Sequence, residues 1–103
     1  MKRGEIRWYK FTSPDKKRPV LLLTRNSIIE YLGEITIAPI TTTIRDIPTE
    51  VLLSKHDGMT RDCAVNLDHL QTVSKSKIGA FIAQLSQEKL KEVQKAIQFA
   101  LDM

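Results

Sequence analysis

The chain has 103 residues, of which 42% are hydrophobic and 27% are charged, and this balance predicts one globular domain spanning residues 1–103. The N-terminal residues are charged where a secretory signal would be apolar, and no apolar run reaches the roughly 18 residues that a transmembrane helix needs. These features argue against export and membrane insertion, so we expect a cytoplasmic protein with no membrane association.

The first predicted strand covers residues 5–11, where Ile6 and Trp8 fall on one face and the odd-numbered side chains on the other. Residues 12–17 combine turn formers with charge, so they predict a loop. The second strand is predicted to begin at Pro19, because proline is tolerated at the first position of a strand.

The middle of the chain continues in short β segments. Residues 26–32 could hold a turn or a short helical piece. Four more strands are predicted from β-branched alternation between turn signals, over residues 34–39, 49–53, 63–67 and 78–85. Six short strands in a chain of this length predict a small barrel or a strongly coiled sheet.

The final segment changes its hydrophobic period from two to 3.6 and predicts an amphipathic helix packed on the sheet. Ser86 stands at the expected N-cap, and Glu88 lies in the first turn, where a negative charge suits the helix dipole. The apolar stripe of this helix consists of Leu90, Val93, Ile97 and Leu101, flanked by Ala96 and Ala100. The expected fold class is therefore mostly β with a C-terminal helix.

Positive charge is concentrated at one end of the sequence. Residues 1–18 carry seven basic side chains against two acidic ones, whereas the whole chain has a net charge of +4. Such a region favours a polyanionic partner, although basic clusters are also common on ordinary solvated surfaces. Because a domain of this size buries only about two-thirds of the surface that its unfolded chain exposes, we also expect dimerisation.

The common catalytic signatures are absent from the sequence. It has no glycine-rich phosphate loop, no cysteine pair and no His-Glu-x-x-His motif, so we expect neither a cofactor nor a metal site. Cys63 is the single cysteine and is expected to be a small buried side chain. His56 and His69 could in principle serve as the acid and base of a ribonuclease, but the turn sequence around His56 argues against this pairing.

Two polar segments lie at ends of predicted strands and could carry chemistry. They are Lys16, Lys17 and Arg18 before the second strand, and Thr41, Thr42 and Thr43 after the third. Cleavage of RNA by its own 2′-hydroxyl needs charge stabilisation on the phosphorane oxygens and a route for two protons. Arginine can donate two hydrogen bonds to a phosphate, and a threonine hydroxyl can donate to the developing charge. Taken alone, these residues support nucleic-acid binding, and surface charge or simple β propensity explains them as well.

Five sequence segments together carry a resemblance to a known family. They are Arg3-Gly4-Glu5-Ile6, Arg18-Pro19-Val20-Leu21, Ile37-Ala38-Pro39-Ile40-Thr41, Asp62-Cys63-Ala64-Val65-Asn66-Leu67-Asp68 and Thr72-Val73-Ser74-Lys75. In this order and spacing, across nearly the whole chain, they resemble the MazF/PemK toxins. The resemblance implies an SH3-like small barrel of the CcdB/MazF type, a homodimer and a metal-independent endoribonuclease acting on single-stranded RNA at short sequences. It also implies an acidic cognate antitoxin that occupies the RNA groove.

The resemblance also implies roles for individual residues. The arginine of the family's Arg-Pro-Val motif falls on Arg18, and the threonine that ends its Ala-Pro-Ile-Thr motif falls on Thr41, so these two are the expected catalytic pair. The family's base-contacting stretch maps onto residues 62–72 and makes His69 and Gln71 the expected base readers. The remaining expected RNA contacts are Lys16, Lys17, Thr42 and Thr43.

The chain departs from the family pattern in the loop before Arg18. Many members carry a glutamate in a longer, glycine-containing loop, whereas here only Asp15 could substitute for it. Arginine is a poor general base, so the group that removes the 2′-hydroxyl proton stays open. Two alternative functions also stay open: a non-enzymatic toxin of the same fold that inhibits DNA gyrase, and an RNA-binding module that does not cleave.

Overall fold

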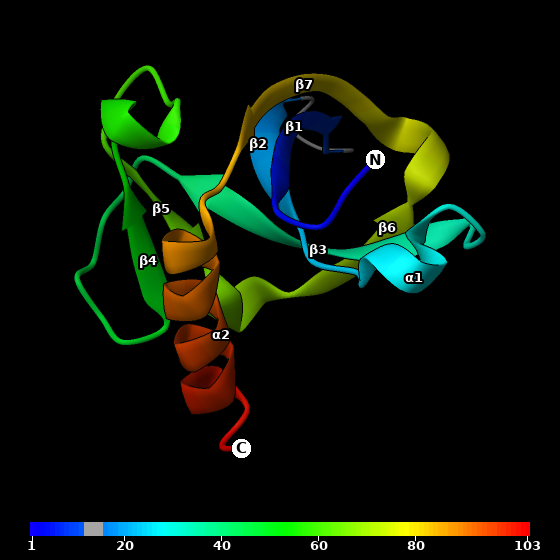
Figure 1. Ribbon diagram of the computed structural model, residues 1–103. Helices are drawn as coiled ribbons and strands as arrows, with labels where there is room; N and C mark the ends of the chain where they lie inside the picture. Colours follow the sequence, from blue (N-terminus) through cyan, green and yellow to red (C-terminus); the bar gives the residue numbers. More distant parts are fainter. Residues whose placement is uncertain (12–15) are drawn as a thin grey trace.

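The computed structural model describes residues 1–11 and 16–103 and consists of short antiparallel strands followed by one long C-terminal helix (Figure 1). The strands are β1 (Glu5–Lys10), β2 (Lys17–Leu22), β3 (Glu34–Thr41), β4 (Glu50–Leu53), β5 (Cys63–Asn66), β6 (Gln71–Ser74) and β7 (Ile78–Gln84). The helices are α1 (Asn26–Ile29) and α2 (Gln87–Ala100), and the short 3-10 turns are η1 (Lys55–Asp57), η2 (Leu67–His69) and η3 (Lys75–Lys77). The expected mostly-β class with a C-terminal helix is confirmed.

The strands pair in the order β4-β5-β3-β2-β1-β7, and β6 pairs with β3 as a branch from this path. All of these pairs are antiparallel. In Figure 1, β7 arches over β1 and β2, while β4, β5 and α2 lie together on the other side of β3. Within the described residues no ladder joins the two end strands, so the sheet has the coiling of a small barrel without a closed ring of strands.

Three details of the predicted strands were wrong. The third strand was expected to end at Pro39, but it runs to Thr41, because Ile40 and Thr41 pair with β5. A seventh strand, β6, was missed because its four residues contain a single buried apolar side chain, Val73, and so show no hydrophobic period. The second strand begins at Lys17 and not at Pro19, since Lys17 and Arg18 pair with β1 opposite Lys10 and Tyr9. Arg18 therefore belongs to the sheet and not to a loop.

Apolar side chains pack against both faces of the sheet. The larger cluster includes Ile6, Leu21 and Ala38 and lies under α2. The smaller cluster, on the other face, includes Tyr9, Val20 and Leu22. This arrangement explains the uninterrupted apolar run of β2, because a strand that is buried on both faces has no polar alternation.

Helix α2 begins as the sequence predicts. The Ser86 hydroxyl accepts a hydrogen bond from the Lys89 backbone N–H at 3.1 Å, which satisfies one of the free amides of the first turn. Leu90, Val93 and Ala96 are buried against the sheet, and Ile97 is partly buried. Leu101 was expected on the same stripe, but it lies beyond the last helical residue with 55% of its surface exposed.

No helix in the described part of the chain is both long and apolar enough to cross a lipid bilayer.

Candidate active site

Arg18 and Thr41 lie at the same end of the β2–β3 ladder. The last residues that pair across this ladder are Val20 and Pro39, and each of the two expected catalytic residues lies two positions beyond one of them. Because side chains alternate between the faces of a strand, Arg18 shares the face of Val20 and Thr41 shares that of Pro39. The fold thus brings to one edge and one face of the sheet two residues that are far apart in the sequence.

The side chain of Arg18 is available to a ligand. Its residue is exposed, and within the described residues its guanidinium has neither an ion pair nor a hydrogen bond. Lys16 and Lys17 are also exposed beside it, and Lys17 lies opposite Lys10 across the β1–β2 ladder. Arginine keeps its positive charge at any working pH, so Arg18 presents a positive charge to a ligand at this edge.

Thr41 is oriented by the residues that follow it. The Thr43 backbone N–H donates to the Thr41 hydroxyl oxygen at 3.1 Å, which is a local turn typical of threonine. The hydroxyl accepts in this bond, so its own proton remains available to donate to an anion. Thr41 is half-buried, whereas Thr42 and Thr43 are exposed at the start of the loop.

A buried carboxylate fixes the loop that leaves β3. The Glu50 side chain is fully buried and accepts the Arg45 backbone N–H at 2.8 Å, while the Arg45 guanidinium lies 3.9 Å from its second oxygen. That second oxygen has no hydrogen-bond partner in the described structure. This role was not predicted from the sequence, because a single glutamate at the start of a strand forms no recognisable local pattern.

Gln71 lies on the same face as Arg18 but at a distance from it. In β6 it pairs with Ile37, and Ile37 pairs on its other side with Leu22. Leu22 and Arg18 are four residues apart in β2, so their side chains share one face of the sheet. Ile37 precedes Thr41 by four positions, so Gln71 lies about 13 Å from Thr41 along β3, at roughly 3.3 Å per residue.

His69 ends the turn η2 that leads into β6, and it is exposed. The Thr49 hydroxyl donates to the Asp68 carboxylate at 2.6 Å and so ties this turn to the start of β4. His56 lies in η1, at the opposite end of the β4–β5 ladder from η2. The fold therefore does not support His56 and His69 as an acid–base pair.

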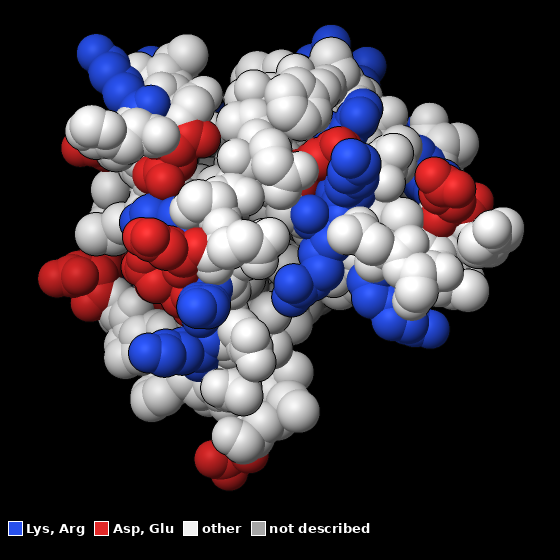
Figure 2. Space-filling view, in the orientation of Figure 1, with Lys and Arg blue, Asp and Glu red and all other residues white. Residues whose placement is uncertain are grey.

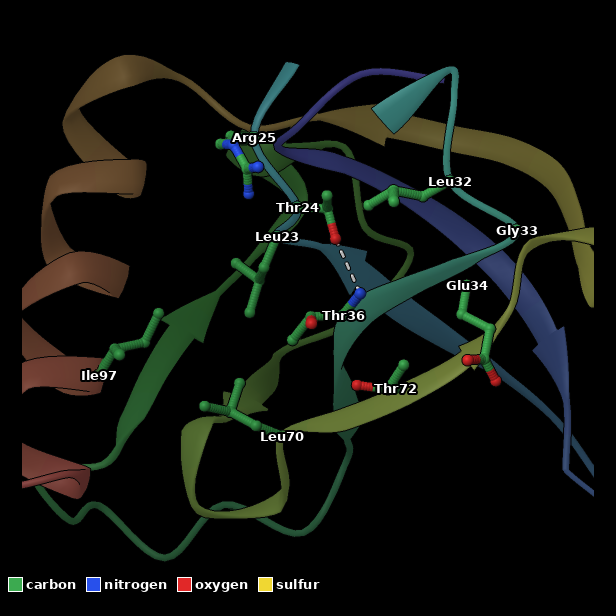
Figure 3. Close-up of a pocket in the computed structure, with 10 residues that line it drawn as sticks. All are labelled: Leu23, Thr24, Arg25, Leu32, Gly33, Glu34, Thr36, Leu70, Thr72 and Ile97. Atoms are coloured by element: carbon green, nitrogen blue, oxygen red, sulfur yellow. Dashed lines mark hydrogen bonds between the residues drawn. The ribbon is translucent and has the colours of Figure 1, made fainter. Parts of the chain in front are cut away.

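Two of the hollows that border the described part of the sheet bear on the site. The smaller one, of about 250 Å³, borders Thr41 and is also lined by Trp8, Pro19 and Met59. The larger one, of about 720 Å³, lies between α2 and the strands β3 and β6. Figure 3 shows Ile97 of α2 on one side of it and Glu34 and Thr72 on the other. Neither Arg18 nor Thr41 lines the larger hollow.

The comparisons with known proteins agree on one family. The family described as "PemK-like, MazF-like toxin of type II toxin-antitoxin system" matches residues 2–101. The chain belongs to this family. It is 37% identical over 89 residues to the endoribonuclease MazF3 of Mycobacterium tuberculosis, covering 86% of each chain.

Solved structures of MazF-like toxins share the whole fold. The M. tuberculosis toxin MazF-mt6 superposes with a TM-score of 0.89 at 34% identity, over 96% of this chain and 97% of that one. A MazE-MazF structure from Deinococcus radiodurans gives a TM-score of 0.85 at 25% identity, over 100% of this chain and 97% of that one. The expected CcdB/MazF-type fold is thereby confirmed.

The basic side chains in the N-terminal region of this MazF-like chain have different roles. The Arg7 guanidinium lies 2.8 Å from the Glu5 carboxylate, donates to the Gly79 carbonyl at 3.1 Å and stands over the Phe81 ring. Arg3 donates to the Leu23 carbonyl at 3.1 Å. Figure 2 shows a band of basic side chains near the N-terminus, whereas acidic and basic side chains are mixed over α2. Arg3 and Arg7 thus stabilise the fold through contacts within the protein, a role that the sequence alone does not reveal.

Other residues of the family-based assignment have simpler outcomes. Cys63 is buried as expected, and burial raises the pKa of its thiol, with a further increase from Asp57 and Asp62. Asp15, the candidate replacement for the loop glutamate, lies outside the described residues. Across residues 1–11 and 16–103, no three His, Cys, Asp or Glu side chains are grouped so that they could hold a metal ion.

Proposed function

We propose that this protein is a single-domain, metal-independent endoribonuclease that cleaves single-stranded RNA at short sequences, with Arg18 and Thr41 as catalytic residues. The observation that carries the proposal is that one sheet edge holds a guanidinium that no described residue neutralises and a hydroxyl whose proton is free to donate. Membership of the toxin family and the 37% identity to an endoribonuclease support the activity.

The reaction that suits this pair uses the RNA's own nucleophile. The 2′-oxygen forms a bond to the adjacent phosphorus, and the bond from phosphorus to the 5′-oxygen of the next nucleotide breaks. One proton leaves the 2′-hydroxyl and one reaches the departing 5′-oxygen, so the products are a 2′,3′-cyclic phosphate and a 5′-hydroxyl. Arg18 stabilises the negative charge that grows on the non-bridging oxygens, and Thr41 donates a hydrogen bond to the same charge.

Lys16, Lys17, Thr42 and Thr43 surround this pair and would contact the RNA backbone, while His69 and Gln71 would contact bases. Lysine ammonium groups neutralise phosphate charge without regard to sequence, whereas an amide or imidazole can hydrogen-bond to base edges. The edge around Arg18 would therefore determine the affinity for RNA, and η2 and β6 would determine which base sequence is preferred. This division also accounts for cleavage at short sequences.

The partners follow from the same assignment. We propose a cognate antitoxin protein as the regulator, since the family is one of type II toxin-antitoxin systems and a MazE-MazF pair shares this fold. An acidic segment would complement the positive edge at Arg18. RNA as the substrate implies that the protein works in the cytoplasm.

We propose further that the larger hollow is the homodimer surface. Leu32 and Ile97 line it, and Leu32 is 39% exposed. Arg25 and Glu34 also line it, so a twofold axis could set Arg25 of one protomer against Glu34 of the partner subunit. Sedimentation should show a dimer that Leu32→Glu converts to a folded monomer, and a wild-type monomer would contradict this surface.

The activity is tested by incubating the purified protein with a long single-stranded RNA in EDTA. We expect defined fragments that end in a 2′,3′-cyclic phosphate. As the control, an RNA with a 2′-deoxy sugar at the mapped cleavage position should stay intact, because it lacks the nucleophile. Uncut RNA under all conditions would exclude the nuclease and leave RNA binding or gyrase inhibition, which electrophoretic-shift and supercoiling assays distinguish.

A further inference from the structure

The smaller hollow beside Thr41 has the size and the lining of a binding site for one small group. Its volume of about 250 Å³ is below the roughly 300–1,000 Å³ of pockets for drug-sized ligands. Its apolar walls include Trp8, Pro19 and Met59, and its polar side chains include Thr42, Thr60 and Arg61. Apolar walls with a few polar groups are typical of sites that hold one ring in a chosen orientation.

Trp8 is the aromatic wall of this hollow. It pairs directly with Pro19 across the β1–β2 ladder, and both side chains line the same space. Trp8 is 40% exposed, although Ile6 on the same predicted face is fully buried. This aromatic surface, which the core does not cover, lies on the face of β1 and β2 opposite to Arg18, and the hollow reaches the catalytic edge at Thr41.

The part of the lining around Met59 is held in place by local hydrogen bonds. The Ser54 backbone N–H donates to the Asp57 carboxylate at 2.9 Å, and the Ser54 hydroxyl accepts the His56 backbone N–H at 3.2 Å, which together form a capping box. Gly58 follows with a φ of +92°, and a Cβ there would come within 2.8 Å of the Ala83 side chain. This tight turn fixes Met59, which is 9% exposed, as a wall of the hollow.

Charge and position both suit RNA. Arg61 is exposed at the hollow, where it can pair with a phosphate, and Thr41 lines the same hollow. Cys63 at the wall is nearly fully buried, and burial raises its thiol pKa, so it adds no negative charge near neutral pH. Single-stranded RNA is commonly bound by bases that turn outward and stack on aromatic side chains.

We propose that this hollow binds one unpaired nucleobase of the RNA, adjacent to the phosphate that is cleaved, with Trp8 and Met59 on its two sides and Arg61 at the flanking phosphate. This proposal rests on the proposed ribonuclease function and adds to it a second specificity site, whose lining does not include Gln71. It makes Trp8 a substrate-binding residue of the proposed reaction and not a merely structural one.

The test combines Trp8→Ala with removal of single bases from the RNA. In the wild type, an abasic nucleotide at one position next to the cleavage site should lower kcat/KM about tenfold, as expected for loss of one stacked base. Trp8→Ala should cause a similar loss with the intact RNA, mainly through KM, and no additional loss with that abasic RNA. Equal, independent losses from the two changes would overturn the subsite.

Three controls keep the result interpretable. Trp8→Phe retains an aromatic wall and should recover most of the binding, which a mere folding defect would not. Phe81→Ala removes an aromatic side chain that is 52% exposed elsewhere on the sheet, and it should leave the abasic profile unchanged. Thermal unfolding of each variant identifies any loss of fold.

A binding measurement separates this inference from the proposed function. Trp8 is the single tryptophan of the chain, so its fluorescence reports on the hollow directly. An RNA with a 2′-deoxy sugar at the cleavage position should change this fluorescence on binding, and its abasic version should not. An unchanged signal with tightly bound RNA would overturn the subsite while leaving cleavage intact. A signal that responds only to an acidic antitoxin peptide would also overturn it and would assign the hollow to a protein side chain.

Discussion

Arg7 and Arg18 come from the same basic stretch and lie on neighbouring strands, but the fold uses them in opposite ways. The Arg7 guanidinium contacts the Glu5 carboxylate, the Gly79 carbonyl and the Phe81 ring, and these contacts join β1 to β7. Arg18 has no such partners within the described residues and lies at an open edge beside Thr41. Basic residues that look equivalent in a sequence can thus be divided by the fold into structural and functional ones.

The sharpest test of this difference is to replace each arginine by alanine. Arg18→Ala should lower kcat by about 10²- to 10³-fold, the usual cost of removing one group that stabilises transition-state charge. Its melting temperature should stay within about 1–2 °C of wild type, because an exposed side chain without partners contributes little to stability. Single-turnover cleavage and calorimetry measure the two quantities.

Arg7→Ala is the matched control and should give the reverse pattern. Loss of its partly buried contacts should lower the melting temperature by about 4–8 °C, as expected for roughly 1 kcal/mol in a domain of this size. The single-turnover rate at a temperature where the variant is folded should remain near wild type. A large rate loss in Arg7→Ala would remove the distinction between the two arginines.

Thr41→Val tests the hydroxyl on the catalytic side of the comparison. Valine keeps the shape and the β propensity of threonine but cannot donate a hydrogen bond, so kcat should fall about 10- to 100-fold. Thr41→Ser retains the donor and should lose less than threefold. Rapid-quench kinetics distinguish these outcomes, and equal rates for the two variants would show that the hydroxyl has no catalytic role.

A smaller effect is expected from the base readers. His69→Ala and Gln71→Ala should change the rate less than about fivefold, since both are proposed to contact bases and not the reacting phosphate, but they should alter which sequences are cut. Sequencing the 5′-hydroxyl ends from a mixed RNA pool measures this preference. An unchanged cleavage profile in both variants would show that η2 and β6 do not read bases.

The smallest effect concerns Cys63 and does not depend on catalysis. Because burial raises the pKa of its folded-state thiol, the associated stability is fully present below the unfolded pKa of about 8.5 and is lost as the pH rises through the folded value. Wild-type stability should therefore fall more steeply than that of Cys63→Ala between about pH 8 and pH 10. Urea titrations at each pH give the two slopes, and parallel slopes would contradict the burial effect.

The sequence predicted those parts of the fold that local pattern determines. The period of α2 and the Ser86 cap identified the helix, and alternation identified most strands. It missed β6, because four residues with one buried side chain carry no period, and it misjudged Leu101, because a stripe continues in sequence after the helix has ended. Local pattern does not contain these tertiary facts.

The candidate site was likewise predicted only in part from the sequence. Motifs pointed to Arg18 and Thr41, but their placement at one sheet edge depends on the register of β2 against β3, which no local signal reveals. Trp8 was read as half of a simple alternation, yet shifts in the β1–β7 register accompany its exposure beside a hollow. The role of Glu50 became visible only through its buried bond to the backbone of Arg45.

One consequence of the β3 pairing concerns the spacing between the bond that is cut and a base that is contacted. Thr41 and the partner of Gln71 belong to the same uninterrupted strand, so rigid backbone and not loop length sets the offset between the bond that is cut and the base that Gln71 contacts. Insertions or deletions in the surrounding loops would change affinity or access but leave this offset intact. Because β3 sets this distance, proteins that keep the strand should contact RNA at the same distance from the cleaved bond, even where their preferred bases differ.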